Sequence, residues 1–168
     1  KTKRRFNWLL LNLFTAFLAT YCISLFGATI EQMVVWAFLM PIVASMGGNA
    51  GMQTLAVTVR TIATNDLTQN NFSSNVFKEF SIGILNGVIF AAISAFIVQI
   101  WFQDSMLSII ISISMVLTMI IAGLFGILVP FSLKKMNIDP AIASSVFVTT
   151  ITDVIGFVSF LGVGAYFL

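Results

Sequence analysis

Five long apolar stretches, separated by polar breaks, run through the whole sequence, and the longest break, from Arg60 to Glu79, is predicted to be a loop. They cover residues 6–28, 33–59, 80–102, 106–133 and 141–168. A helix needs about 20 mostly apolar residues to cross a hydrocarbon core roughly 30 Å thick, and each stretch reaches that length. The pattern therefore predicts an all-α membrane protein with five transmembrane helices per chain.

Composition excludes most other classes of protein. Hydrophobic residues make up 59% of the sequence and charged residues 8%, whereas a typical soluble domain is about 25% charged. The basic residues cluster beside the apolar stretches and do not alternate with exposed aromatic residues, so the sequence predicts no nucleic-acid partner. Membrane lipid is the expected surrounding.

Charge asymmetry predicts the orientation of the chain. An odd number of spans places the N-terminus on the same side as the breaks that follow the second and fourth spans. The basic residues on that side are Lys1, Lys3, Arg4, Arg5, Arg60, Lys78, Lys134 and Lys135, and the other side has none. Because Lys and Arg mark the cytoplasmic side, we expect a multi-pass protein of the cell membrane with a cytoplasmic N-terminus and an external C-terminus.

The start of the sequence indicates a longer parent protein. It reads "KTKRR", without an initial methionine. The apolar stretch that follows is too long for the core of a signal peptide. We therefore expect residues 1–168 to be the transmembrane domain of a larger protein that has a cytosolic part upstream.

The sequence contains no histidine and one cysteine, Cys22. Histidine is the commonest metal ligand and the commonest general base, so its absence excludes zinc-type sites and Ser/His catalysis. A single cysteine permits no disulfide within the chain. These absences favour a protein that is not an enzyme.

Asp153 is the one ionisable residue deep inside an apolar stretch. It lies 13 residues after Pro140, which is about 20 Å along a helix and therefore near the middle of a bilayer. An Asp at that depth costs roughly 2.5 to 3.5 kcal/mol unless it has a partner or faces water. No Lys, Arg or His lies inside a span to neutralise it, so a cation site explains it better than a protonated structural carboxyl group.

Hydroxyl groups precede this carboxylate on the same helix. Thr149 and Ser145 lie four and eight residues before Asp153, so all three follow one helix face toward the cytosol. Thr150 and Thr152 lie beside that face and are expected to bond back to backbone carbonyls, with Thr152 kept as a weaker candidate ligand.

Asp139 stands at the predicted start of the fifth span, immediately before Pro140. Asp is a favoured N-cap residue and Pro a favoured first residue of a helix. A carboxylate at the cytosolic mouth of a pore also attracts cations. The sequence is compatible with both roles.

The second span contains the segment "PIVASMGGNAGMQ". Its helix-weakening residues are Pro41, Gly47, Gly48 and Gly51. They predict a kinked or partly unwound helix with a role in the pore or its gating, because broken backbone at membrane depth is tolerated only inside protein or beside water. The amides of Asn49 and Gln53 lie one turn apart in the same segment and are candidate pore residues, Asn49 also as a ligand.

The small residues of the third and fourth spans have a simpler interpretation. In the third span they recur every four residues, at Gly83, Gly87, Ala91 and Ala95. Such a stripe allows close approach of another helix, and the small polar residues of the fourth span suit hydrogen bonds between helices. We predict packing roles for both.

The candidate ligands are all oxygen atoms, from a carboxylate, hydroxyls, amides and carbonyls. Such a set suits hard cations such as magnesium, calcium or manganese. Magnesium gives up its waters reluctantly, and one Asp per chain is a small charge for a divalent ion. Two copies on a twofold axis would supply two carboxylates, so we expect a C2 homodimer.

Two segments resemble the MgtE family of magnesium channels. They are "PIVASMGGNAGMQ" at 41–53 and "DPAIASSVFVTTITDVIG" at 139–156, and five spans in the same order extend the likeness over essentially the whole chain. The resemblance implies that residues 1–168 are the ion-conducting domain of a homodimer. In such a dimer the pore lies at the axis between the second and fifth helices, and the residue matching Asp153 holds hydrated Mg²⁺. The resemblance also implies cytosolic regulatory domains upstream, among them paired CBS modules that close the pore when magnesium is plentiful.

Other functions are possible. A secondary transporter that exchanges a divalent cation for Na⁺ or H⁺ would normally have an internal repeat or a second coupling carboxylate, and the spans reveal neither. An intramembrane aspartyl enzyme needs two carboxylates, which Asp153 could supply only from two subunits. A purely structural membrane anchor leaves a charge in mid-span unexplained.

Overall fold

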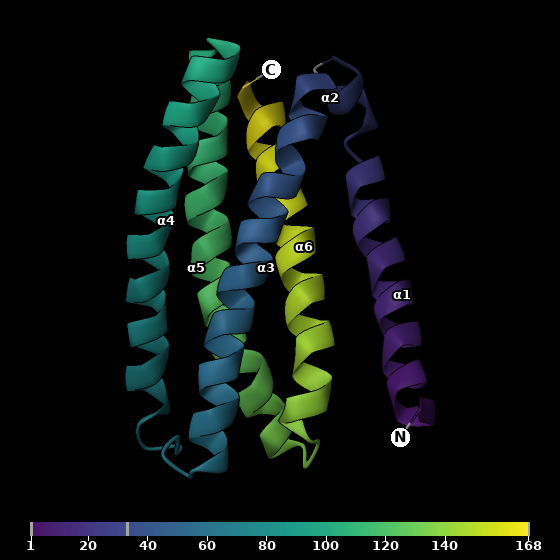
Figure 1. Ribbon diagram of the computed structural model, residues 1–168, viewed down its shortest axis with the longest axis vertical. Helices are drawn as coiled ribbons and strands as arrows, with labels where there is room; N and C mark the ends of the chain where they lie inside the picture. The colour runs from purple at the N-terminus through teal and green to yellow at the C-terminus, as the bar shows by residue number, and fades with distance from the viewer. Residues whose placement is uncertain (1, 33, 168) are drawn as a thin grey trace.

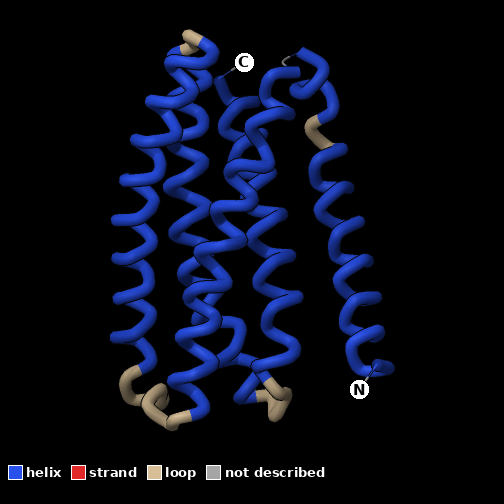
Figure 2. The backbone as a smooth tube through the Cα atoms, in the orientation of Figure 1, coloured by secondary structure: helices blue, strands red, loops and turns tan. Residues whose placement is uncertain are grey.

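The computed structural model describes residues 2–32 and 34–167, and these form a bundle of helices (Figures 1 and 2). The helices are α1 (Thr2–Ser24), α2 (Gly27–Gln32), α3 (Val34–Ala63), α4 (Phe72–Phe102), α5 (Ser105–Lys135) and α6 (Pro140–Phe167). All but α2 are long and apolar enough to cross a membrane. The prediction of an all-α protein with five spans is confirmed, although the predicted ends at Met33 and Leu168 lie outside the described residues.

The third span begins earlier than the sequence indicated. The polar stretch before residue 80 was predicted to be a loop, but α4 already begins at Phe72. The ring of Phe72 stacks on Phe131 of α5, with centroids 3.9 Å apart, and Leu67 in the loop is also buried. These apolar contacts hold the polar stretch against α5, and they place Glu79 about two turns inside a helix.

Three helices form the centre of the bundle. α3, α5 and α6 each contact the other two, whereas α4 packs mainly on α5 and α1 mainly on α6. α4 and α1 therefore stand at two opposite edges (Figure 1). α1 begins and α6 ends at opposite ends of the long axis, as an odd number of spans requires.

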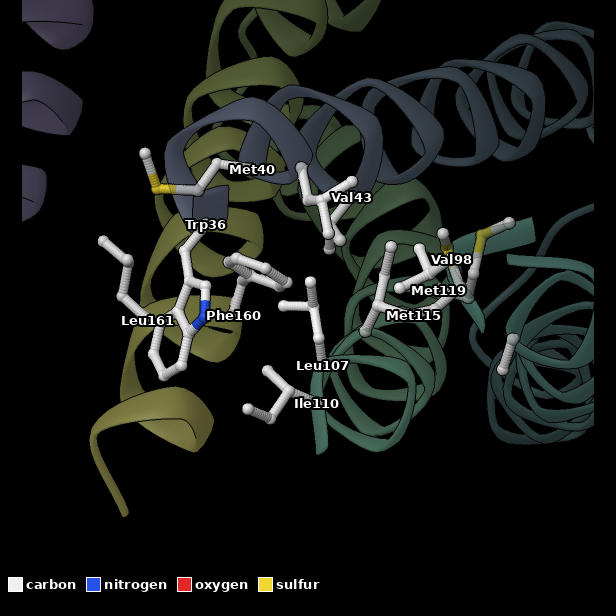
Figure 3. Close-up of a cluster of buried hydrophobic side chains, with 13 residues drawn as sticks. Trp36, Met40, Val43, Val98, Leu107, Ile110, Met115, Met119, Phe160 and Leu161 are labelled. Atoms are coloured by element: carbon white, nitrogen blue, oxygen red, sulfur yellow. The ribbon is translucent and has the colours of Figure 1, made fainter. Parts of the chain in front are cut away.

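A cluster of large buried side chains joins the central helices near the start of α3 and the end of α6 (Figure 3). The Trp36 and Phe160 rings meet edge to face, with centroids 6.3 Å apart. Leu107, Ile110 and Met115 of α5 fill the space beside them and are at most 1% exposed. This cluster fixes α3 against α5 and α6 at the end of the bundle far from the basic loops.

Small residues bring α4 and α5 together, as their spacing predicted. A Cβ atom at Gly83 would lie 2.9 Å from the Cα atom of Ile120, and one at Gly87 would lie 3.0 Å from the Cα atom of Val116. Ser112 of α5 donates a hydrogen bond to the carbonyl oxygen of Ala91 at 3.5 Å. The stripe therefore serves helix packing.

The same kind of contact between α3 and α6 can be tested by adding one methyl group. We expect Gly156→Ala to destabilise the bundle by about 1 to 3 kcal/mol, the usual cost of overpacking, because the new Cβ would lie 2.8 Å from the Cα atom of Ala44. Thermal unfolding in detergent measures the effect. Gly162→Ala is the matched control on the same helix, since no atom lies within 4 Å of its new Cβ. Equal stability of the two variants would contradict the proposed close approach.

Candidate functional site

α3 and α6 run antiparallel with a register that can be read from their closest contacts. A Cβ atom at Gly164 would meet the ring of Trp36, one at Gly156 would meet Ala44, and one at Gly48 would lie 3.9 Å from the Thr152 hydroxyl. Each step along α3 is therefore matched by one step back along α6. Asp153 lies at the level of residues 47–48, Thr149 at the level of 51–52, and Ser145 at the level of 55–56.

The glycines of α3 are packing residues. A Cβ atom at Gly47 would collide with Thr118 of α5, and one at Gly51 would lie 2.9 Å from Val148 and 3.2 Å from Thr152 of α6. α3 is helical without interruption from Val34 to Ala63. The prediction of a partly unwound second span is therefore wrong, because these glycines admit neighbouring helices rather than break their own.

Pro41 also lies within the continuous part of α3. It is exposed and comes in the second turn of the helix, so it removes a backbone hydrogen bond close to the helix start. The residues that follow retain their helical conformation.

Thr152 lies in the interface that these glycines create. It is completely buried, and its hydroxyl donates to the carbonyl oxygens of Val148 and Thr149, both at 3.0 Å. Thr150 likewise donates to Val146 at 2.6 Å. Both threonines bond back to their own helix, as predicted, and Thr152 is separated from the outer surface of α6.

Thr152 of α6 and Gly48 of α3 lie next to each other. Asp153 comes directly after Thr152, and Asn49 comes directly after Gly48. One residue turns a helix by about 100°, and on both helices this turn leads away from α5. The side of α6 that faces α5 carries Ser159, whose hydroxyl lies 3.0 Å from that of Thr118. Asp153 is partly exposed and Asn49 is exposed. A carboxylate and an amide therefore lie at one level on the outer side of the α3–α6 pair.

Thr149 and Ser145 continue from Asp153 toward the start of α6 and are partly exposed. The Thr149 hydroxyl donates to the carbonyl oxygens of Ser145 at 2.8 Å and Val146 at 3.2 Å. Because its hydrogen is engaged by the backbone, its oxygen lone pairs are free to accept a hydrogen bond from water. The arrangement can accept hydrogen bonds from the water shell of a cation.

Asp139 directly precedes the start of α6 and is not brought near Asp153. Its carboxylate accepts a hydrogen bond from the backbone N–H of Ala141 at 2.9 Å. The predicted capping role is therefore confirmed. Attraction of cations by Asp139 remains a prediction.

Gln53 lies one turn beyond Asn49 on α3 and is rotated from it by about 40° around the helix. It lines a cavity of about 190 Å³ on the side of α3 that faces α4 and α5. Glu79 and Asn86 of α4 line the same cavity. Sequence reasoning missed Glu79 because it was assigned to a loop. The signal that could have placed it on a helix was the apolar spacing of Phe72, Val76 and Phe80 around it.

Carboxylates are sparse at membrane depth. Among the residues that the structure describes, no three Asp, Glu or Cys side chains gather into a metal-binding group. Any cation beside Asp153 would therefore meet one carboxylate per chain and otherwise neutral oxygens.

Comparison with known proteins identifies the family. A family model described as MgtE, divalent cation transporter, matches residues 40–163. A protein named magnesium transporter MgtE from Bacillus subtilis is 33% identical over 165 residues, which cover 98% of this chain and 37% of that protein. Proteins of the same name from Enterococcus faecalis and Thermus thermophilus are 28% and 29% identical, each over 98% of this chain and 36% of its own length. The chain thus spans little more than a third of these relatives. The matched region includes nearly all of α3 and α6, and the chain belongs to the MgtE family of divalent cation transporters.

Proposed function

We propose that this chain forms the pore of a magnesium channel and conducts Mg²⁺ as a largely hydrated ion past Asp153. The observation that carries the proposal is the position of this carboxylate, partly exposed on the outer side of the α3–α6 pair and level with the amide-bearing turn of α3. Neither group is tolerated against lipid at that depth, so both must face water or another protein surface.

A second copy of the chain would supply a second carboxylate for the ion. Two chains related by a twofold axis beside α3 and α6 would bring two Asp153 carboxylates to one aqueous path. Their combined charge of about −2 balances that of Mg²⁺, and closed C2 assembly is the commonest arrangement of a homo-oligomer. The relatives named magnesium transporter support Mg²⁺ as the substrate.

The waters bound to Mg²⁺ explain why a few protein oxygens are sufficient to hold the ion in the proposed pore. Mg²⁺ keeps most of its waters at about 2.0 to 2.1 Å, so the protein needs acceptors for the outer hydrogens of those waters. Asp153, the Thr149 and Ser145 hydroxyls and the Asn49 amide oxygen are such acceptors. Asp139 would raise the local cation concentration at the cytosolic mouth. In the full-length protein, N-terminal and CBS domains would control opening from the cytosolic side.

Asp153→Asn should weaken the selectivity for divalent over monovalent cations at least tenfold while leaving the fold intact. The amide keeps the shape and hydrogen-bonding capacity of the side chain but removes one charge per subunit. Ion flux into liposomes and calorimetric Mg²⁺ titration measure the effect. Asp153→Glu, which keeps the charge, should retain much of the selectivity. Cobalt hexammine, a mimic of the hydrated ion that does not exchange its ligands, should compete with Mg²⁺. Unchanged affinity and selectivity in Asp153→Asn would remove the basis of this proposal.

Asn49→Leu should reduce Mg²⁺ flux by tenfold or more without a matching loss of folded protein, because the exposed amide would serve pore water rather than a contact within the chain. Asn49→Ser, which keeps a small polar group, is the matched variant and should conduct better. Flux in liposomes is compared with recovery of the dimer in detergent. If Asn49→Leu fails to assemble while the remaining dimer conducts normally, Asn49 has an assembly role instead.

The proposed orientation can be tested with single cysteines introduced into a Cys22→Ala background. Cysteines at exposed positions of the loop between α3 and α4, such as Gln69, should react with a membrane-impermeant reagent only after the cytosolic side is opened. A cysteine at Gln103, in the turn between α4 and α5, should react from outside. The reverse pattern would contradict the cytoplasmic assignment of the basic loops.

A further inference from the structure

Glu79 is a carboxylate that the proposed pore does not use, and it directly precedes the apolar stretch 80–102. It lies about two turns inside α4 and is only partly exposed. Its carboxylate oxygen Oε2 accepts a hydrogen bond from the Thr54 hydroxyl at 3.0 Å. Within the described residues it forms no ion pair, and its basic neighbour Lys78 is exposed. No salt bridge among the described residues therefore neutralises its charge.

Two cavities meet at this carboxylate. The inner one, of about 190 Å³, lies between α3, α4 and α5 and contains the amides of Gln53 and Asn86. The outer one, of about 230 Å³, lies beside the loop between α3 and α4 and also touches Glu79. Its polar lining includes Asp66 and Asn71 of the loop and Asn75 and Lys78 of α4. A water molecule needs only about 10 to 15 Å³ of such space, so both cavities can hold an ion with several waters. A polar route thus leads from the cytosolic loop past Glu79 to the inner cavity.

The lining of the inner cavity provides oxygen atoms of several kinds. Glu79 provides a carboxylate, Thr54 a hydroxyl, and Gln53 and Asn86 amide carbonyl groups. Hard cations prefer such ligands. The remaining wall consists of glycines and apolar side chains, among them Met119, which is buried, and Val57 and Ile82, which are exposed at the open side of the cavity.

Charge balance decides which cation fits. Glu79 is the one charged residue that lines the inner cavity, so the described lining carries a single negative charge. A monovalent cation would neutralise it, whereas a divalent cation would leave an excess positive charge in a largely apolar pocket, where an unpaired charge is costly. A proton alone would neutralise the carboxylate but would leave the two amide groups without a role.

We propose that the inner cavity is a binding site for a monovalent alkali cation, held by the Glu79 carboxylate together with oxygens of Thr54, Gln53 and Asn86. The site is distinct from the proposed pore, because Asn49 and Asp153 lie on the outer side of α3 and α6, whereas the cavity lies between α3, α4 and α5.

Equilibrium binding of ²²Na⁺ to the purified full-length transporter tests the site, at constant ionic strength with choline chloride as the balancing salt. Saturable binding is expected, with competition by unlabelled alkali cations. Glu79→Gln should weaken it at least tenfold, because the amide retains an acceptor for the Thr54 hydroxyl but removes the charge. Sodium-dependent thermal stabilisation should disappear in the same variant, while its melting temperature in choline remains close to that of the wild type.

Two control variants separate this site from the others. Glu31→Gln removes an exposed carboxylate on α2 and should leave ²²Na⁺ binding unchanged. Asp153→Asn should also bind ²²Na⁺ normally, so a failure of the pore proposal would not affect this result. Absence of saturable binding, or normal binding in Glu79→Gln, would overturn the inference. Saturable Mg²⁺ binding that requires Glu79 in the absence of sodium binding would overturn the assignment to a monovalent ion.

Discussion

The close approach of α3 to α5 and α6 is the constraint on which the rest of the structure depends. Where Gly47, Gly51 and Gly156 stand, any side chain would collide with a neighbouring helix. Lipid tails are as apolar as the helices, so association inside a membrane depends on such close packing and on hydrogen bonds between helices. The contact also orients the neighbouring polar residues. With Gly48 and Thr152 turned toward each other, the next residue on each helix is turned away from α5, and these residues are Asn49 and Asp153.

Features that are local in the sequence were predicted well. The five spans follow from apolar length, and the cap at Asp139 follows from the Asp-Pro pair, because both depend on residues close together in the chain. The small-residue stripe of α4 was also interpreted correctly, since a four-residue period marks one helix face whatever its partner is.

Features that depend on contacts between distant segments were predicted poorly. The glycines of α3 weaken an isolated helix, but Thr118 and Val148 of other helices fill the space beside them, and the helix remains continuous. The start of α4 was placed too late because polar residues dominate the stretch before residue 80. Phe72 nevertheless finds a stacking partner in Phe131, which lies far away in the sequence. Glu79 was missed for the same reason.

The carboxylates of Asp153 and Glu79 differ in whether a twofold axis can bring a second copy of each beside the first. Asp153 lies on the outer side of the central helices, so a second chain can place an equivalent carboxylate opposite it, and the doubled charge matches a divalent ion. Glu79 lines a half-open cavity formed by α3, α4 and α5 of its own chain, so its charge stays single in any dimer formed through the outer side of α3 and α6. α3 lies between the two sites and contributes Asn49 to one and Gln53 to the other. A shift or rotation of this one helix would change both sites together, and the closely packed glycine contacts limit how far it can move independently of α5 and α6.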